Sequence, residues 1–82
     1  MKEINLNEWE LIRAIPSRNN QSHSLYRIKN IYIGIWYNIW VNKQTGNIRI
    51  NHTYSNDKVK DKYIKLITDA FNLWMKLKEI AE

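Results

Sequence analysis

The segment 31–41 alternates between two kinds of side chain along its whole length. Because successive side chains of a β-strand point to opposite faces, an extended segment would separate the odd positions from the even ones. The odd positions carry residues suited to a core, namely Ile31, Ile33, Ile35, Tyr37, Ile39 and Val41. The even positions carry rings that alternate with small or polar residues, namely Tyr32, Gly34, Trp36, Asn38 and Trp40. We therefore predict a strand with a core face and a second face rich in aromatic rings.

A hairpin is predicted to follow this strand. The loop 42–47 leads to a second β-rich run, and Gly46 can take the left-handed conformation that closes such a loop. The register that suits both runs pairs Val41 with Ile48, Ile39 with Ile50, Tyr37 with His52 and Ile35 with Tyr54. On the other face it pairs Trp40 with Arg49, Asn38 with Asn51 and Trp36 with Thr53. A slip of one residue would invert every side chain, so the match on both faces supports this register.

A shorter strand is predicted at 25–30, ahead of the long one, with a tight turn at Lys29-Asn30. This arrangement would set Arg27 across from Tyr32. The segment 17–24 is polar throughout and is predicted to be a loop.

Helices are predicted at both ends of the chain. The segment 4–15 has apolar residues at helical spacing, among them Leu6, Trp9 and Ile12. The segment from about Asp57 to Ile80 has a longer apolar stripe at spacings of three and four residues. Its members are Val59, Tyr63, Ile67, Ala70, Trp74, Leu77 and Ala81.

A chain of 82 residues is long enough for one hydrophobic core. We expect a single small α+β domain over residues 1–82, in which a three-stranded antiparallel β-meander has a long C-terminal helix packed on one face and a short N-terminal helix. The sequence has no Cys, so packing alone must hold the fold. No run approaches the roughly 18 consecutive apolar residues of a membrane span, and we expect a soluble, cytoplasmic protein without membrane contact.

Positive charge is concentrated in the middle of the chain. The net charge is +5, and the segment 17–54 contains no carboxylate. Its basic residues are Arg18, Arg27, Lys29, Lys43 and Arg49. A sheet segment of one sign predicts an electropositive face that attracts polyanions. A genome rich in AT, which favours Ile, Asn and Lys through its codons, would explain part of the composition without any such function.

Residues suited to catalysis or metal binding are scarce. The two His residues, His23 and His52, have no second His or Cys at ligand spacing. In the predicted register His52 points to the helix-covered side and is interpreted as a core or edge residue. No glycine-rich phosphate loop, nucleophile elbow or paired-carboxylate motif occurs. We therefore expect no enzymatic activity, no catalytic residue, no metal site and no cofactor.

The aromatic face is the first candidate binding surface. It would carry three rings and two guanidinium groups, from Tyr32, Trp36, Trp40, Arg27 and Arg49. Rings flanked by guanidinium groups can stack bases and contact phosphates, as in sheets that bind single strands. The alternative is that the N-terminal helix covers these rings, with Trp9 against them and the arginines as cation–π partners.

The start of the C-terminal helix is the second candidate. Four lysines fall within its first nine residues, namely Lys58, Lys60, Lys62 and Lys65. Lys58, Lys62 and Lys65 would share one helical face. Cations at a helix N-terminus oppose the macrodipole, which a phosphate partner would explain. The alternative is an ordinary solvated face rich in lysine.

The predicted order of elements is similar to that of the double-stranded-RNA-binding domain. In that family a helix and three antiparallel strands precede a helix whose lysines touch phosphates across the major groove. The segment Asn56–Lys62 matches the family's Lys-Lys-x-x-Lys pattern loosely, and Lys29-Asn30 stands where the family has a Gly-Pro-x-His loop. The resemblance is one of element order.

The leading hypothesis is a non-enzymatic nucleic-acid-binding module for RNA or DNA. Its phosphate contacts would come from Arg27, Arg49, Lys58, Lys62 and Lys65, and its stacking rings would be Tyr32, Trp36 and Trp40. The alternative is a small inhibitor or adaptor, of the kind that phages and mobile elements encode, which binds a host protein such as a nucleic-acid-processing enzyme. Trp, Tyr and Arg are also the usual hot spots of protein interfaces. A third hypothesis is a homodimer that buries the aromatic face.

Overall fold

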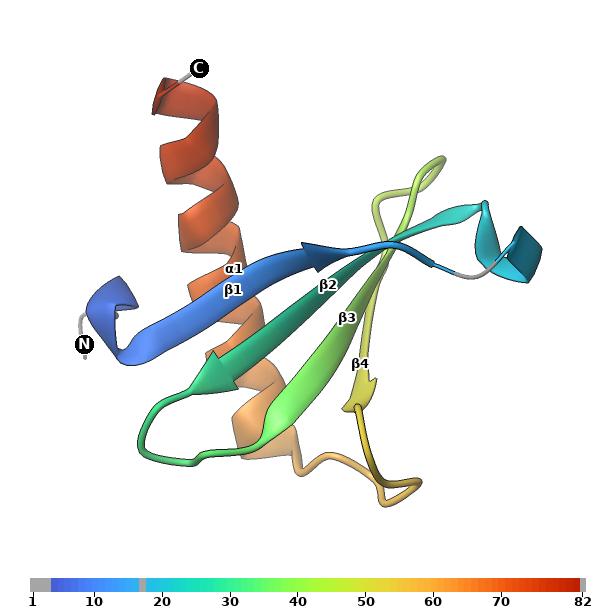
Figure 1. The fold of residues 1–82 in the computed structure, drawn as a ribbon. Helices are drawn as coiled ribbons and strands as arrows, with labels where there is room; N and C mark the ends of the chain where they lie inside the picture. The colour runs from blue at the N-terminus through green and yellow to red at the C-terminus, as the bar shows by residue number, and fades with distance from the viewer. Residues whose placement is uncertain (1–3, 17, 82) are drawn as a thin grey trace.

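The computed structural model describes residues 4–16 and 18–81 (Figure 1). Its elements are a 3-10 turn at Leu6–Glu8, strand β1 (Trp9–Ala14), a 3-10 turn at Arg18–Asn20, strands β2 (His23–Asn30), β3 (Trp36–Asn42) and β4 (Ile48–His52), and helix α1 (Asp61–Ala81). The four strands form one antiparallel sheet in the order β1-β2-β3-β4, and α1 crosses one face of it. The fold is α+β with a long C-terminal helix, as predicted, but the sheet has four strands instead of three. Within the described ranges, no helix is long and apolar enough to cross a membrane.

The N-terminal helix predicted for residues 4–15 is wrong, because this segment forms the first 3-10 turn and β1. β1 pairs with β2, with Leu11 opposite Ile28. Trp9 and Leu11 face the core, and Glu10 between them faces the other side. The segment therefore fits the alternation of a strand as well as the spacing of a helix. The strand forms because it gives hydrogen-bond partners to backbone groups along the edge of β2, which a helix would leave unpaired.

The strands β2 and β3 have other bounds than predicted. β2 already begins at His23, inside the predicted loop 17–24, of which Ser17 lies outside the described residues. It continues through Lys29-Asn30, so the tight turn predicted there is wrong. The strand predicted from residue 31 begins only at Trp36, and residues 31–35 form the loop between β2 and β3.

Asn30 explains where this loop begins. Its side-chain oxygen accepts hydrogen bonds from the backbone N–H groups of Tyr32 (2.9 Å) and Ile33 (3.2 Å). The N–H of Gly34, which has a φ of 74°, donates to the backbone oxygen of Asn30 at 2.8 Å. Asn side chains stabilise turns by such bonds, and here they outweigh the strand preference of the isoleucines that follow.

The predicted pairing of β3 with β4 is confirmed. The partners are Val41 with Ile48, Trp40 with Arg49, Ile39 with Ile50, Asn38 with Asn51 and Tyr37 with His52. The predicted pair of Ile35 with Tyr54 is wrong, because both residues lie outside the strands. The backbone N–H of Thr53 still donates to the backbone oxygen of Trp36 at 3.3 Å. Gly46 has a φ of 76°, as the hairpin loop requires.

The core lies between the sheet and α1. Its buried members are Trp9, Tyr26, Ile28, Tyr37, Ile39, Val59, Ile67, Ala70 and Phe71. The rings of Tyr26 on β2 and Phe71 on α1 lie 5.0 Å apart between their centroids. α1 begins at Asp61 rather than at the predicted Asp57, and Val59 in the preceding connection is buried in the core. Residues 57–60 therefore belong to the connection between β4 and α1 and not to the helix.

Candidate functional site

The sheet face opposite α1 carries most of the aromatic and basic residues of the predicted site. We call it the open face, and it consists of Glu10, Ile12, Ala14, His23, Leu25, Arg27, Lys29, Trp36, Asn38, Trp40, Arg49 and Asn51. These residues alternate along the strands with core residues such as Ile28 and Ile39, so they point away from α1. Among the elements that the structure describes, none crosses this face (Figure 1).

The strand register places a cation beside each Trp of the open face. Lys29 on β2 lies opposite Trp36, and Arg49 on β4 lies opposite Trp40. Arg27 on β2 occupies the row between them. Trp36 and Trp40 lie on the same strand, at a spacing of about 13 Å for an extended chain. The open face therefore combines two separated rings with three cationic side chains.

Side-chain contacts hold the cations of β2 against the sheet. The Nζ atom of Lys29 lies 5.1 Å from the centroid of the Trp36 ring and 3.8 Å from a carboxylate oxygen of Glu10. The Nε–H of Arg27 donates to Oδ1 of Asn38 at 3.4 Å. The ammonium group of Lys29 thus lies over the Trp36 ring, where a planar ligand would stack.

Two buried polar atoms on the open face have no hydrogen-bond partner within the described residues. They are Nε1 of Trp40, a donor, and Oδ1 of Asn51, an acceptor. The ring of His23 lies 6.3 Å from the Trp40 ring, nearly perpendicular to it. An unpaired buried polar atom costs about 1–3 kcal/mol. The open face therefore retains hydrogen-bonding capacity that the fold does not use.

The alternative in which the N-terminal segment covers the rings is wrong. Trp9 is buried in the core, on the same side of the sheet as α1. Ile4 and Leu6, which precede β1, also pack against the core. Trp36 and Trp40 are both partly exposed on the other side. Residues 4–8, ahead of β1, therefore leave these two rings accessible.

Tyr32 does not belong to the open face. It lies in the loop between β2 and β3 and is 76% exposed. Arg27, predicted to face it, lies opposite Asn38 instead. Lys29 lies opposite Trp36 and was not among the predicted site residues. Lys29 follows Arg27 by two residues, so on a continuous strand both side chains lie on the same face. Lys29 was missed because a turn, and not a strand, was predicted at Lys29-Asn30.

The lysines of the predicted helix start lie apart from the open face. Lys58 precedes α1, whereas Lys62 and Lys65 lie in its first two turns, and all three are exposed. The helical face predicted to join Lys58 to the other two therefore does not form. The Nζ atom of Lys62 lies 5.0 Å from the ring centroid of Tyr63. Because α1 packs on the core side, Lys62 and Lys65 are separated from Trp36 and Trp40 by the sheet.

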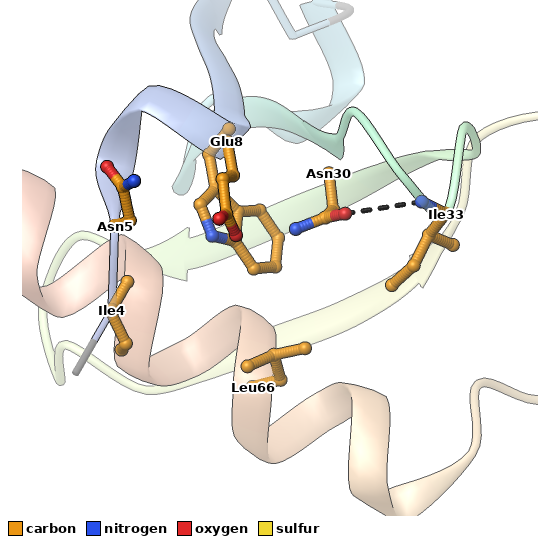
Figure 2. Close-up of a pocket in the computed structure, with 7 residues that line it drawn as sticks. Ile4, Asn5, Glu8, Asn30, Ile33 and Leu66 are labelled. Carbon is orange, nitrogen blue, oxygen red and sulfur yellow. Dashed lines mark hydrogen bonds between the residues drawn. The ribbon is translucent and has the colours of Figure 1, made fainter. Parts of the chain in front are cut away.

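A cavity of about 360 Å³ lies on the α1 side of the sheet (Figure 2). It is lined by Ile4, Asn5, Glu8, Trp9, Asn30, Ile33 and Leu66. It forms where the first 3-10 turn, the loop after β2 and α1 meet. The cavity could not be predicted from the sequence pattern, because it depends on β1 and on the turn after Asn30. A helix was predicted for residues 4–15 and a strand from residue 31 instead.

One core residue has a shifted pKa. Burial raises the pKa of Tyr37 above its usual value of 10.0, and the neighbouring Tyr63 adds to the shift. The ring of His52 lies 5.0 Å from that of Tyr37, on the core side that the predicted register gives it. In the part of the chain that the structure describes, no three side chains of His, Asp or Glu gather as a metal site would need.

The chain matches no protein-family model, no curated protein and no solved structure. The resemblance of element order to the double-stranded-RNA-binding domain does not hold, because β1 stands in place of the first helix. Function is therefore inferred from the geometry of the open face and of the cavity.

Proposed function

We propose that the protein is a non-enzymatic nucleic-acid-binding module that holds unpaired bases on its open face. The observation that carries this proposal is the partly exposed position of Trp36 and Trp40 on a face that also holds Arg27, Lys29 and Arg49. Bases stack on aromatic rings, and Arg and Lys contact the phosphates between them. A duplex keeps its bases stacked on each other, so such rings favour a single strand.

The charge of the open face supports a polyanionic partner. Of the residues that form it, Arg27, Lys29 and Arg49 are cationic and Glu10 alone is acidic. Glu10 lies on the edge strand β1 and is paired with Lys29. The strands β2, β3 and β4 contain no Asp or Glu. A bound phosphate chain would therefore meet attraction across three of the four strands.

Stacking at Trp36 requires Lys29 to leave the ring. A cation over an exposed ring contributes about 0.5–1 kcal/mol, whereas a stacked base contributes about 1–3 kcal/mol. The displaced amine can then contact a phosphate. The exchange is therefore favourable, and Lys29 moves from the ring to the backbone of the bound strand.

The lysines near the start of α1 have a different role in this proposal. Lys62 and Lys65 lie on the other side of the sheet from the two rings. They add to the general attraction of the molecule for polyanions without touching the segment that stacks on Trp36 and Trp40. The open face supplies the specific contacts.

Fluorescence-anisotropy titration of labelled single-stranded and double-stranded DNA and RNA tests the proposal. Trp36→Ala and Arg49→Gln should each weaken single-strand binding by about tenfold. Tyr32→Ala removes an exposed ring away from the open face, and Lys62→Gln removes a cation on α1. Both controls should leave the affinity nearly unchanged. Absence of binding to all four nucleic acids at low salt, or equal losses in the controls, contradicts the proposal.

The loop between β2 and β3 favours a second candidate, a protein-binding inhibitor or adaptor. Ile31, Tyr32 and Ile35 are all exposed within this short loop. Exposed apolar side chains that lie together often mark protein interfaces. In this case Tyr32→Ala should abolish capture of a host protein, such as a nucleic-acid-processing enzyme, and Trp36→Ala should not. The opposite ranking of these two variants would favour the open face.

A further inference from the structure

The cavity beside Glu8 has the size and position of a small-molecule site. Its walls come from the segment before β1, from the end of β2 with the following loop, and from α1 (Figure 2). Its volume of about 360 Å³ falls in the usual range of ligand pockets, roughly 300–1,000 Å³. It lies on the α1 side of the sheet and is independent of the open face. We call it the Glu8 cavity.

Most of the wall is apolar. The apolar side chains come from Ile4, Trp9, Ile33 and Leu66. Trp9 is buried and belongs to the core, so this part of the wall is held by packing. The cavity thus offers an apolar ligand body a preformed apolar surface.

Asn30 contributes a fixed hydrogen-bond donor. The side chain is 7% exposed, and its oxygen already accepts from the N–H groups of Tyr32 and Ile33. Because these bonds orient the amide, its NH₂ group points away from Ile33 and into the cavity (Figure 2). Within the described residues this NH₂ group donates to no acceptor. A fixed donor that faces the cavity and has no acceptor among the residues described favours a ligand that carries an oxygen acceptor.

Glu8 gives the cavity its charge. Among the described residues that line the cavity, it is the only charged one. In the described part of the chain the carboxylate of Glu8 forms no ion pair, and the ion pair that is present joins Lys29 to Glu10. A carboxylate set in an apolar wall attracts a cationic donor and repels phosphates and carboxylates. The cavity therefore disfavours anionic ligands, whereas the open face is proposed to bind the polyanion nucleic acid.

We propose that the Glu8 cavity binds a small primary amine with an apolar body and a hydroxyl group, such as an aryl amino alcohol. The ammonium group donates to Glu8, the hydroxyl oxygen accepts from the NH₂ group of Asn30, and the apolar body packs against Trp9 and Leu66. Each of the three parts of the ligand thus meets a group that the fold leaves available.

Titration of the isotope-labelled full chain with phenylethanolamine, followed by NMR, tests this proposal. We expect saturable shifts of the Trp9 indole and Asn30 side-chain amide signals in the millimolar range. Glu8→Gln keeps the shape of the lining and should weaken binding by about tenfold. Glu10→Gln is the matched control, because the same change on the open face should leave binding intact. Leu66→Trp fills the cavity from α1 and should abolish binding.

The choice of probe separates charge recognition from mere apolar filling. Phenylethylene glycol replaces the amine by a hydroxyl group, and mandelate replaces the aminomethyl group by a carboxylate. Both should bind at least about tenfold more weakly than phenylethanolamine. Equal binding of the glycol, unsaturable shifts, or equal affinity of wild type and Glu8→Gln would overturn the proposal. Nucleic acid takes no part in these measurements, so their outcome is separate from that of the proposed function.

Discussion

Asn30 acts at two places in the molecule. Its side-chain oxygen closes the loop that ends β2, and its NH₂ group faces the Glu8 cavity. By ending β2 it also sets the residue at which β3 can begin, and thereby which rings reach the open face. Tyr32 remains in the loop for this reason, whereas Trp36 joins the sheet.

Replacing Asn30 by Ala should lower the free energy of unfolding by about 1–3 kcal/mol, because two hydrogen bonds to partly buried backbone N–H groups are lost. Asn30→Asp keeps an acceptor oxygen but adds a carboxylate at a buried site in the wall that also holds Glu8, so it should not restore the wild-type stability. Urea denaturation measures both differences. Asn47→Ala, in the exposed loop between β3 and β4, is the control and should change stability little. A cost no larger than that of the control would show that the loop does not depend on Asn30.

Tyr37 predicts a pH dependence of stability. Its pKa in the fold is raised above the unfolded value of 10.0, mainly by burial, so the fold retains the neutral phenol to higher pH. The stability that this group contributes is fully present below the unfolded pKa and is lost as pH rises through the folded pKa. Tyr37→Phe cannot ionise, and its free energy of unfolding should fall less steeply above pH 10.0. Denaturation at several pH values measures the slopes, and Tyr54→Phe, an exposed position, should follow the wild type.

Among the elements, α1 shows the sharpest contrast between neighbouring positions. Ile67 is fully buried against the sheet, and Leu66 beside it is 38% exposed. Ile67→Ala should therefore cost about 2–5 kcal/mol, through lost burial and the cavity that it leaves. Leu66→Ala should cost about 1 kcal/mol or less. Thermal and chemical denaturation of the two variants measures the difference, and similar costs would mean that α1 packs with another face than described.

The hairpin of β3 and β4 could be predicted because its information is local. The alternation holds on both strands, and Gly46 sits where the loop needs a positive φ. The segment 4–15 could not, because Trp9 and its neighbours satisfy a helical and a strand pattern at once. The segment becomes a strand because it pairs with the edge of β2, which follows only after residues 15–22. Local propensity carries no information about such a partner.

The candidate site could likewise be predicted only where it depends on the hairpin of β3 and β4. Trp36, Trp40 and Arg49 share one face because their register follows from the hairpin. Lys29 was missed because its pairing depends on the turn after Asn30, where side-chain bonds to the backbone outweigh strand preference. The separation of Lys62 from the rings depends on where α1 packs, which is a property of the whole core.

At the scale of the whole molecule, the fold is a thin, two-layered body that measures 37 × 35 × 19 Å along its principal axes. The sheet is one layer and α1 is the other (Figure 1). The two basic regions lie on opposite sides of this body, on the open face and at the start of α1. A polyanion is thus attracted from both sides but finds aromatic rings on the open face only.

The salt dependence of nucleic-acid binding should show which of the two basic regions contacts the phosphates. If Arg27, Lys29 and Arg49 each contact one phosphate of a single strand, the logarithm of the affinity should fall with the logarithm of salt concentration at a slope of about −2. Arg49→Gln should reduce that slope by about 0.7, and Lys62→Gln should change it less. Anisotropy titrations over a range of salt concentrations measure the slopes. A slope near zero would favour a protein partner over nucleic acid.

All four strands precede α1 in the chain, so the sheet leaves the ribosome before the helix that covers it. Synthesis of the 21 residues of α1 takes roughly one to four seconds at typical elongation rates. During this interval the residues destined for the core are exposed on one side of the nascent sheet while the rings are exposed on the other. Both edge strands are also free to pair with neighbouring chains. We therefore expect the nascent chain to be prone to aggregation, and a premature stop before Asp61 should yield aggregates instead of a partly folded protein.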